Sequence, residues 1–420
     1  MRAMIPMALW LLAALALLAA PLNDRAREFK AQLVEKILPH WFDTAQDTAN
    51  GGYLLSDDLV KGRSTPKEKA IVTQARMIWT FSLAHRKGFS DARRDYLKAA
   101  AQGYRFIIEH FLDKEHGGYF WKTDLAGKPV KQHKFVYGQA FVIYALVEYH
   151  RASGDKEPLR HAMELYRTLQ KRAYDPKSGG WMEHFTRDWT PLALRDPAGE
   201  VEVAGLKSAN THLHLMEALT ELYEVTRDKD VRKSLEESLR LNMEYFYPLD
   251  ASKSCFHRNP DWSAVTDPRS AGLSYGHNVE FAWLMIRAEE AMGRKPSWKQ
   301  FYAHLDHALK VGYDRERGGL YHRGIGNEAP FDTTKVWWVQ AEMIAAFTDA
   351  LRHKRDAAYE AALVKTLEFV ARYMTDPKDG IWVDSVLADG QPKNTSKAHN
   401  WKANYHDVRA LVKFVEAFGK

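Results

Sequence analysis

Two short stretches of the chain place polar groups at spacings that would let them act on one ligand. Asn210 and His214 stand four residues apart, and His277 and Glu280 stand three residues apart. Residues at these separations lie on the same face of a helix. A carboxylate beside an imidazole can orient the ring and raise its basicity, which suits histidine for general acid–base work. These four residues are therefore candidates for proton transfer and substrate binding.

Similar polar or aromatic residues recur near the start of other helical stretches, about once in each. They are Arg76, Tyr137, Trp337, Trp338, Trp401 and His406. Gln139 lies two positions after Tyr137 and is grouped with it. A single histidine in an apolar helix is more often a satisfied core residue than a catalyst. Their recurrence is what makes these residues candidates, provided that the fold brings them together.

A turn of one form recurs along the chain and divides it into units. A glycine pair followed by a large side chain begins at Gly51, Gly117, Gly179 and Gly318. Gly380-Ile381-Trp382 is a shortened version, and Cys255-Phe256 stands where the remaining copy should fall. Successive copies lie about 60 to 75 residues apart, and a regular period of this kind indicates a repeat architecture. Glycine pairs permit turns with positive φ, and the aromatic and β-branched residues nearby predict short hairpins.

Between these turns the chain reads as pairs of helices, because apolar residues recur every three or four positions. The expected pairs are 67–87 with 91–112, 135–152 with 158–173, 206–227 with 231–247, 274–292 with 297–311, and 334–353 with 357–374. Segments 24–42 and 404–418 remain, one at each end, and pairing them with each other closes a ring. An open solenoid would instead end in capping repeats. We therefore predict an all-α (α/α)6 barrel, a toroid of six helix hairpins that forms one catalytic domain over residues 23–420.

The first helix of each pair carries the candidate residues, and the second helix has a different character. Segment 159–165 is typical of the second helices, because it is charge-rich and amphipathic, as expected of an outer layer. In a closed ring, equivalent positions on the six first helices converge on one pocket. The candidate residues should therefore line a single central cavity.

The composition excludes some classes of partner. The net charge of +6 comes from 60 basic and 54 acidic residues that form no long block of one sign, so no nucleic-acid-binding surface is indicated. The 13 Trp, 19 Tyr and 19 Phe residues suit either a large core or a site where aromatic faces stack on sugar rings. The single cysteine, Cys255, excludes an internal disulfide framework. Oligomeric state is left open by the sequence.

Residues 1–22 stand apart from the helix pairs. Arg2 supplies a positive start, and the apolar run from Met7 to Ala20 is too short for a usual membrane span but fits the core of a signal peptide. We predict a cleaved signal peptide and a periplasmic or secreted protein, with no stable membrane insertion after cleavage. Leu18 and Pro21 are unfavourable around a cut after Ala20. The alternatives are an uncleaved N-terminal membrane anchor, or a cytoplasmic protein whose start codon is misassigned.

Metal and nucleotide cofactors are not expected. His212, His214, His277 and His406 could supply imidazoles, but the chain has no His-Glu-x-x-His motif or comparable metal spacing. His212 lies off the face of Asn210 and is interpreted as structural. No glycine-rich phosphate-binding or dinucleotide motif occurs between a strand and a helix.

Four strings of residues resemble the N-acylglucosamine 2-epimerase superfamily, and within it the cellobiose 2-epimerases most closely. They begin at Asn210, Gly276, Trp337 and Trp401 and read NTHLHLMEA, GHNVE, WWVQAE and WKANYH. The resemblance runs from about residue 31 to residue 411. The cellobiose enzymes typically carry Asp and Ile in place of Asn278 and Val279, and Pro in place of Asn404. These departures keep two alternatives open. One is a mannose isomerase, which is an aldose–ketose isomerase, and the other is an N-acylglucosamine 2-epimerase.

The resemblance implies an (α/α)6 barrel that opens a reducing sugar and inverts it at C2 through an enediolate. By position, His277 and His406 are the two catalytic histidines, on opposite faces of C2. The implied substrate-binding residues are Arg76, Tyr137, Asn210, His214, Glu280, Trp337, Trp338 and Trp401. The physical argument agrees, because a weakly acidic C2 proton needs a base together with donors, here Arg76 and His214, that stabilise the enediolate. The expected partner is a small sugar and the expected cofactor is none.

Two further classes of function stay open at this point. Glycoside hydrolases and polysaccharide lyases also use (α/α)6 toroids, and inverting hydrolysis needs two carboxylates across the scissile bond. Glu280 and Glu342 are the convincing pocket acids, against several His, Arg and Trp residues. A non-catalytic carbohydrate- or protein-binding module is the third class. The presence of two histidines, Arg76 and Glu280 together favours an enzyme over such a module.

Overall fold

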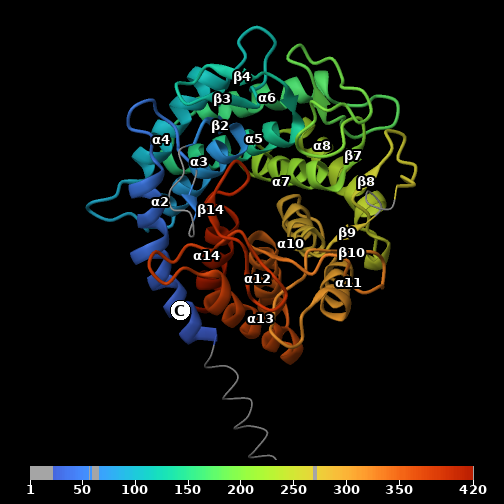
Figure 1. The fold of residues 1–420 in the computed structure, drawn as a ribbon. Coiled ribbons are helices and arrows are strands. Elements are labelled where there is room, and N and C mark those ends of the chain that lie inside the picture. The colour runs from blue at the N-terminus through green and yellow to red at the C-terminus, as the bar shows by residue number, and fades with distance from the viewer. Residues whose placement is uncertain (1–21, 56, 59–65, 268–271, 420) are drawn as a thin grey trace, which may run out of the picture.

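The helices of the chain form a closed ring of two concentric layers (Figure 1). The computed structural model describes residues 22–55, 57–58, 66–267 and 272–419. Within these residues the helices form six pairs, each with one helix in the inner layer and one in the outer layer. The predicted (α/α)6 barrel is confirmed.

The inner helices are buried on nearly every side. They are α3 (Ile71–Arg86), α5 (Val136–Ser153), α7 (Ala209–Thr226), α10 (Tyr275–Ala291), α12 (Trp337–His353) and α14 (His406–Phe418). In α5, for example, every residue from Val136 to Tyr149 is buried. A helix packed on all sides needs apolar residues all round, which explains why polar residues in the inner layer are conspicuous.

The outer helices bury one face and expose the other. They are the segment from residue 22 to α2 (Leu38–Ala45), α4 (Tyr96–Phe106), α6 (Glu157–Arg172), α8 (Lys229–Leu241), α11 (Trp298–His307) and α13 (Ala357–Phe369). Short π-helical stretches adjoin or interrupt several of them: η1 (Leu33–Ile37), η2 (Ile107–Phe111), η3 (Asn242–Phe246), η5 (Ala308–Gly312) and η6 (Val370–Met374). In α8, Val231, Leu235 and Leu239 are buried at four-residue intervals, as the amphipathic pattern predicts.

The glycine turns form short hairpins that are tied to the next inner helix by a buried ion pair. In the second copy, the Asp113 N–H donates to the Gly118 carbonyl at 2.9 Å, and the Gly117 N–H donates to the Asp113 carbonyl at 2.8 Å. Gly117 and Gly118 have φ of 74° and 71°, which side chains with a Cβ rarely adopt. Lys134, two residues before α5, donates to the Asp113 carboxylate at 3.0 Å. The equivalent pairs are Lys69–Asp47, Lys207–Asp175, Lys335–Asp314 and Lys397–Asp376.

Small antiparallel sheets link neighbouring repeats at the N-terminal ends of the inner helices. In the second repeat, β5 (Lys134–Phe135) leads directly into α5 and pairs with β6 (His184–Phe185), which follows the next turn. Two sheets have three strands, in the orders β2 (Glu68–Ala70), β3 (Lys122–Asp124), β4 (Pro129–Lys131) and β11 (Lys335–Val336), β12 (Ser385–Val386), β13 (Pro392–Asn394). The remaining described sheets have two strands: β7 (Lys207–Ser208) with β8 (His257–Arg258), β9 (Leu273–Ser274) with β10 (Arg323–Gly324), and β1 (Asp57–Asp58) with β14 (Ser396–Ala398). The sheets and turns therefore fix where each inner helix begins.

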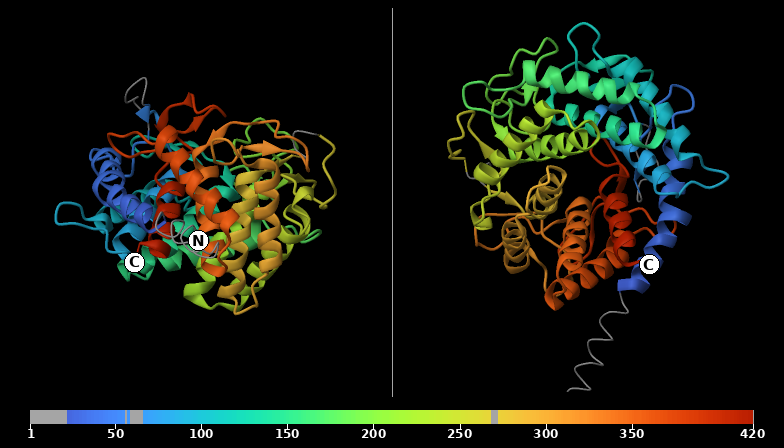
Figure 2. Two further views of the ribbon diagram at one scale, coloured as in Figure 1. Left: turned by 90° about the horizontal axis from the view of Figure 1, so that it is seen from below. Right: turned by 180° about the vertical axis from the view of Figure 1, so that it is seen from behind.

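The two ends of the chain close the ring, as predicted from the two unpaired segments. The first outer helix lies beside α14 (Figure 2), where the rings of Phe29 and Phe414 meet edge to face at 6.1 Å. The start of α14 also packs against α3, because the Thr80 hydroxyl donates to the Asn404 carbonyl at 3.2 Å. Residue 76 and residue 406 are thereby brought to the same part of the barrel.

The predicted signal peptide lies almost entirely outside the described residues. Its last residue, Leu22, is the first described residue; it lies in the first helix and is 2% exposed. In the part of the chain that the structure describes, no helix combines the length and the apolar character needed to cross a membrane.

Candidate active site

The ten candidate residues line one cavity of about 370 Å³ at the N-terminal ends of the inner helices. They are Arg76, Tyr137, Asn210, His214, His277, Glu280, Trp337, Trp338, Trp401 and His406. All six inner helices contribute at least one of them, and Trp401 comes from the loop before α14. The volume lies in the range usual for small-molecule sites. The chemical roles of these residues remain predictions.

His406 is backed by a carboxylate. Its Nδ1 lies 2.7 Å from Glu342 Oε1, so the Nδ1–H donates to the carboxylate and Nε2 carries the lone pair. Burial lowers the pKa of His406 to about 3, although the hydrogen bond to Glu342 opposes this shift. The ring is therefore neutral over a wide pH range and can act as a base through Nε2.

His277 is instead held by a neutral amide. Its Nε2 lies 3.2 Å from Asn210 Oδ1, and the Asn210 amide nitrogen donates to Glu202 Oε1 at 3.0 Å, which fixes the orientation of the amide. Among the described residues, Nδ1 of His277 is buried without a hydrogen-bond partner. Burial lowers the pKa of His277 well below its ordinary value, and the nearby His214 lowers it further.

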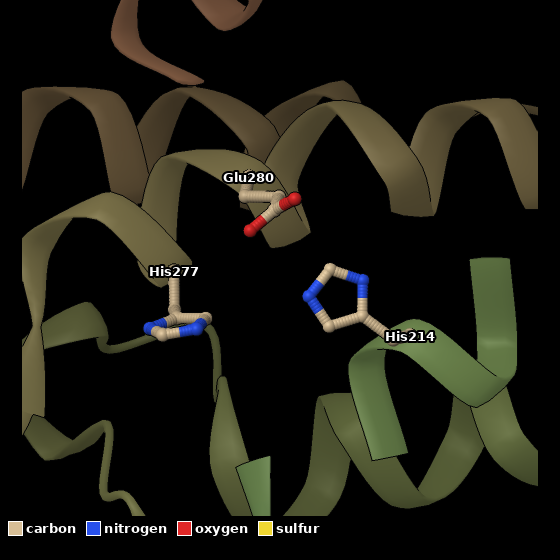
Figure 3. Close-up of side chains that lie close together, drawn as sticks. All are labelled: His214, His277 and Glu280. Carbon is tan, nitrogen blue, oxygen red and sulfur yellow. The ribbon is translucent and has the colours of Figure 1, made fainter. Parts of the chain in front are cut away.

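A third histidine, His214, faces the same space from α7. Figure 3 places its ring opposite His277 and Glu280, which extend from α10. A nitrogen of each histidine and an oxygen of Glu280 lie within 4.8 Å of one another. The His214 Nδ1 lies 2.9 Å from Glu217 Oε2, so its Nε2 is left for a ligand. Burial raises the pKa of Glu280 well above its ordinary value, and the neighbouring Glu342 carboxylate raises it further.

Arg76 brings a positive charge that no carboxylate in the described part of the chain neutralises. Its guanidinium donates to the Trp401 carbonyl at 2.7 Å and to the Tyr137 hydroxyl at 2.9 Å, and it lies 4.3 Å from the centre of the Phe141 ring. These contacts fix its orientation without cancelling its charge. Arg76 is therefore suited to bind a developing negative charge on a ligand oxygen.

Trp338 forms the wall between the two candidate catalytic histidines. Its ring centre lies 4.5 Å from that of His277 and 6.0 Å from that of His406. Trp401 lies near Tyr137, with ring centres 6.3 Å apart. Aromatic faces at these positions suit the C–H surface of a sugar ring.

The sequence analysis missed a layer of charged residues behind the histidines. Arg409 on α14 donates to Glu280 Oε1 and to Glu342 Oε1, both at 2.7 Å, and also to Glu217. Glu217 follows His214 by three positions, and Arg409 follows His406 by three. The same spacing rule that paired His277 with Glu280 could have identified both.

Loop residues that line the cavity were also missed. Glu200 and Glu202 come from the loop before β7, and His322 and Arg323 come from the turn at β10. The His322 Nδ1 lies 2.8 Å from Asp332. No periodicity marks these residues, and their proximity to the cavity depends on how the repeats close into a ring.

Gln139, which the sequence analysis grouped with Tyr137, does not line the cavity. Its side chain accepts from the Tyr119 N–H and donates to the Tyr119 carbonyl, both at 2.8 Å. It therefore holds the glycine turn. His212 holds the glycine turn of the next repeat, where the Trp181 N–H donates to its Nε2 at 3.4 Å.

Among the described residues, two groups of three side chains have spacings that could hold a metal ion. They are His214, His277 and Glu280, and Glu280, Glu342 and His406. In the second group, both carboxylates already accept hydrogen bonds from Arg409 at 2.7 Å. A cation there would lie beside a guanidinium, so the charges favour proton transfer over metal binding.

The comparisons with known proteins agree in the family that they indicate. The family model for N-acylglucosamine 2-epimerase matches residues 55–410. Cellobiose 2-epimerase of Ruminococcus albus is 32% identical over 395 residues, covering 92% of this chain and 97% of that protein. D-mannose isomerase of Marinomonas mediterranea is 24% identical, covering 93% of this chain and 97% of that protein. The solved structure of cellobiose 2-epimerase from Spirochaeta thermophila has a TM-score of 0.84 at 32% identity, covering 94% of this chain and 97% of that chain.

Proposed function

The chain belongs to the N-acylglucosamine 2-epimerase family, and we propose that it is a sugar 2-epimerase acting on the reducing-end glucose or mannose unit of a free sugar. Cellobiose is the first substrate to test, since it is the sugar in the names of the relatives in R. albus and S. thermophila. The observation that carries the proposal is the pair His277 and His406, which reach one cavity from different helices.

In the proposed reaction the two histidines exchange protons with C2 on opposite faces. One neutral imidazole takes the C2 proton of the open-chain aldehyde, and the electrons of the broken C–H bond move to the carbonyl oxygen to form an enediolate. The other histidine, which is protonated when the negative charge of the enediolate beside it raises its pKa, delivers that proton to the opposite face of C2. The electrons then return from oxygen, which restores the aldehyde with inverted C2. A histidine in each position can serve as base or acid, so the reaction can run in both directions.

Stabilisation of the enediolate oxygen is assigned to Arg76, whose guanidinium has no carboxylate partner among the described residues. The expectation that His214 donates to the same oxygen needs correction: its Nδ1–H donates to Glu217, so Nε2 presents a lone pair and is suited to accept a hydrogen bond from a sugar hydroxyl. Donors already fixed in place act on a developing charge without further reorganisation, and each is commonly worth about 10²–10³ in kcat. Tyr137, Asn210, Glu280, Trp337, Trp338 and Trp401 are proposed to bind the sugar.

An aldose–ketose isomerase is the second candidate, supported by the relative named D-mannose isomerase. In that reaction one base can carry the proton from C2 to C1 of the same enediol. Incubation with cellobiose, mannose, glucose and N-acetylglucosamine in D2O, followed by proton NMR, separates the two. Deuterium at C2 in both epimers supports the epimerase, whereas formation of fructose from mannose assigns the isomerase instead.

We also infer that residues 23–420 act as a single catalytic domain and that the protein is exported to the periplasm or secreted. The support is the apolar run from Met7 to Ala20 behind Arg2. Mass spectrometry of the protein from its native host tests the export. An intact Met1 on a protein recovered from the cytoplasm contradicts it.

A further inference from the structure

We propose that Arg409 is a positioning residue that holds His214 and His406 in their reactive forms through two carboxylates, without touching the substrate itself. The proposal rests on the proposed function of the cavity. Arg409 does not line the cavity that holds the two histidines. It is 6% exposed and lies one helical turn behind His406 on α14.

The guanidinium of Arg409 joins carboxylates from three other inner helices. One terminal nitrogen donates to Glu280 of α10 and to Glu342 of α12, both at 2.7 Å. The other donates to Glu217 of α7, which also accepts the Tyr405 hydroxyl at 2.9 Å. Arg409 is thus a shared counter-ion for three buried acids.

Two of these acids bind a histidine directly. Glu342 Oε1 accepts hydrogen bonds from both Arg409 and His406 Nδ1. Glu217 joins the same two kinds of partner through different oxygens, since Oε1 accepts from Arg409 and Oε2 accepts from His214 Nδ1. The positive charge of Arg409 lowers the pKa of Glu342 and that of Glu217, against the opposite effect of burial. An ionised carboxylate can only accept a hydrogen bond, so the ring proton stays on Nδ1 and Nε2 keeps its lone pair towards the cavity.

Removal of Arg409 would leave three carboxylates together in a buried site. Uncompensated buried charge is costly, so protons would be taken up to reduce it. The charged and titratable groups that face the Glu342–His406 pair are Arg76 from α3, His277 and Glu280 from α10, and Arg409 itself. Tyr405 also borders it, with its ring centre 4.7 Å from that of His406, while Tyr144 from α5 and Glu217 from α7 act on Arg409. Among them, Arg76 and Arg409 are the cations that oppose protonation of His406.

The sign of the pH effect follows from that charge. Arg409 lowers the pKa of His406, so its loss raises the pKa of the coupled Glu342–His406 pair. The base is then protonated at a higher pH, and the acid limb of kcat/KM moves towards neutral pH. A residue with a purely structural role would change the melting temperature and leave that limb in place.

The test compares Arg409→Met and Arg409→Lys with Arg287→Met, a matched control. Arg287 is also an inner-helix arginine paired with two acids, Glu221 at 2.7 Å and Glu224 at 3.1 Å, but neither of these acids binds a histidine. We expect Arg409→Met to lower kcat by about 10²–10⁴-fold, the range for loss of acid–base function, with little change in KM and with the acid limb moved to higher pH. Arg409→Lys keeps the charge and should keep the limb near its original pH. Arg287→Met should lower the melting temperature and keep the wild-type pH profile.

Nitrogen-15 NMR of labelled histidine supplies a second readout that needs no activity. His406 and His214 should be Nδ1–H tautomers in the wild type and should lose that preference in Arg409→Met. An unchanged tautomer and an unchanged acid limb in a folded Arg409→Met protein, with reduced stability alone, overturns the proposal. Absence of C2 exchange in the wild type contradicts the proposed function instead, and the tautomer measurement still decides the role of Arg409.

Discussion

The two ends of the ring are lined by the same inner helices, yet their charged groups behave differently. The C-terminal ends of these helices surround a hollow of about 770 Å³, whereas the cavity at the N-terminal ends has about 370 Å³. In the larger hollow, arginines pair with acids, as Arg287 does with Glu221 and Arg86 with Glu148, both at 2.7 Å. In the smaller cavity, Arg76 has no acid partner in the described part of the chain.

This difference distinguishes the proposed ligand site, at the N-terminal ends of the inner helices, from the hollow at their C-terminal ends. A buried polar group without a partner is costly, and a site can retain such groups when a ligand completes their hydrogen bonds. The ion pairs at the far end are already complete, so they stabilise the inner helices and leave little for a ligand. Cavity volume alone would identify the far end as the ligand site, whereas the unpaired polar groups identify the end that carries the histidines.

The largest expected effect comes from the two candidate catalytic histidines. His277→Ala and His406→Ala should each lose net epimerisation by several orders of magnitude, because a missing acid or base usually costs about 10²–10⁴-fold and one face of C2 loses its proton carrier. Each variant should still exchange deuterium into one epimer, and the two variants should differ in which one. Proton NMR of the gluco and manno sugars in D2O measures this. A His406→Ala enzyme with the wild-type rate contradicts the two-base assignment.

A direct contrast between the two ends comes from one arginine at each. Arg76→Met should lower kcat by about 10²–10³-fold, as loss of a fixed donor at a developing charge does. Arg287→Met, at the far end, should keep kcat within a few-fold and unfold at a slightly lower temperature, because Glu221 and Glu224 lose one cationic partner but keep their ion pairs with Arg151. Steady-state kinetics and thermal unfolding followed by circular dichroism measure both. Equal losses of kcat in the two variants would remove the functional distinction between the ends.

A smaller effect is expected from pH. Burial lowers the pKa of His406 to about 3, so its imidazole stays unprotonated as the pH falls through 6.5, the ordinary histidine value. The acid limb of kcat/KM, which reports the free enzyme, should therefore lie below pH 6. Circular dichroism at each pH controls for unfolding. A limb at or above pH 6.5 in a folded enzyme would assign the base to a group with an unshifted pKa.

The smallest effect should follow removal of residues 1–21. The N-terminal segment belongs to none of the helix pairs predicted from the sequence, and the truncation keeps Leu22, which is 2% exposed, so the truncated protein should retain its melting temperature and its kcat. Expression of the full-length and truncated chains side by side, with differential scanning calorimetry and the exchange assay, measures this. A large loss of stability in the truncated chain would place the N-terminal segment within the folded domain.

Much of this architecture could be predicted because it is periodic. The glycine turns and the three- and four-residue apolar spacing predicted the helix pairs, and the recurrence of residues such as His277 and Tyr137 near the start of each first helix predicted that they line one cavity. Glu217 and Arg409 obey the same spacing but were missed, since a charge within an apolar helix gives no sign of which neighbour neutralises it. Glu202 lies in a loop and Arg323 in the two-residue strand β10, neither in a repeating pattern, and their distance from the cavity depends on how the repeats close into a ring.

Closure of the ring by its two terminal segments also bears on how the molecule is made. Arg76 is synthesised early, whereas His406 and Arg409 lie on α14, the last helix of the chain. Contacts between segments more than 300 residues apart, such as that of Thr80 with Asn404, require a large loop to close before they stabilise anything, which slows folding. During translation the nascent chain can stack its repeats in order, but it cannot assemble the cavity until α14 has left the ribosome. Catalytic competence is therefore acquired only with the final helix.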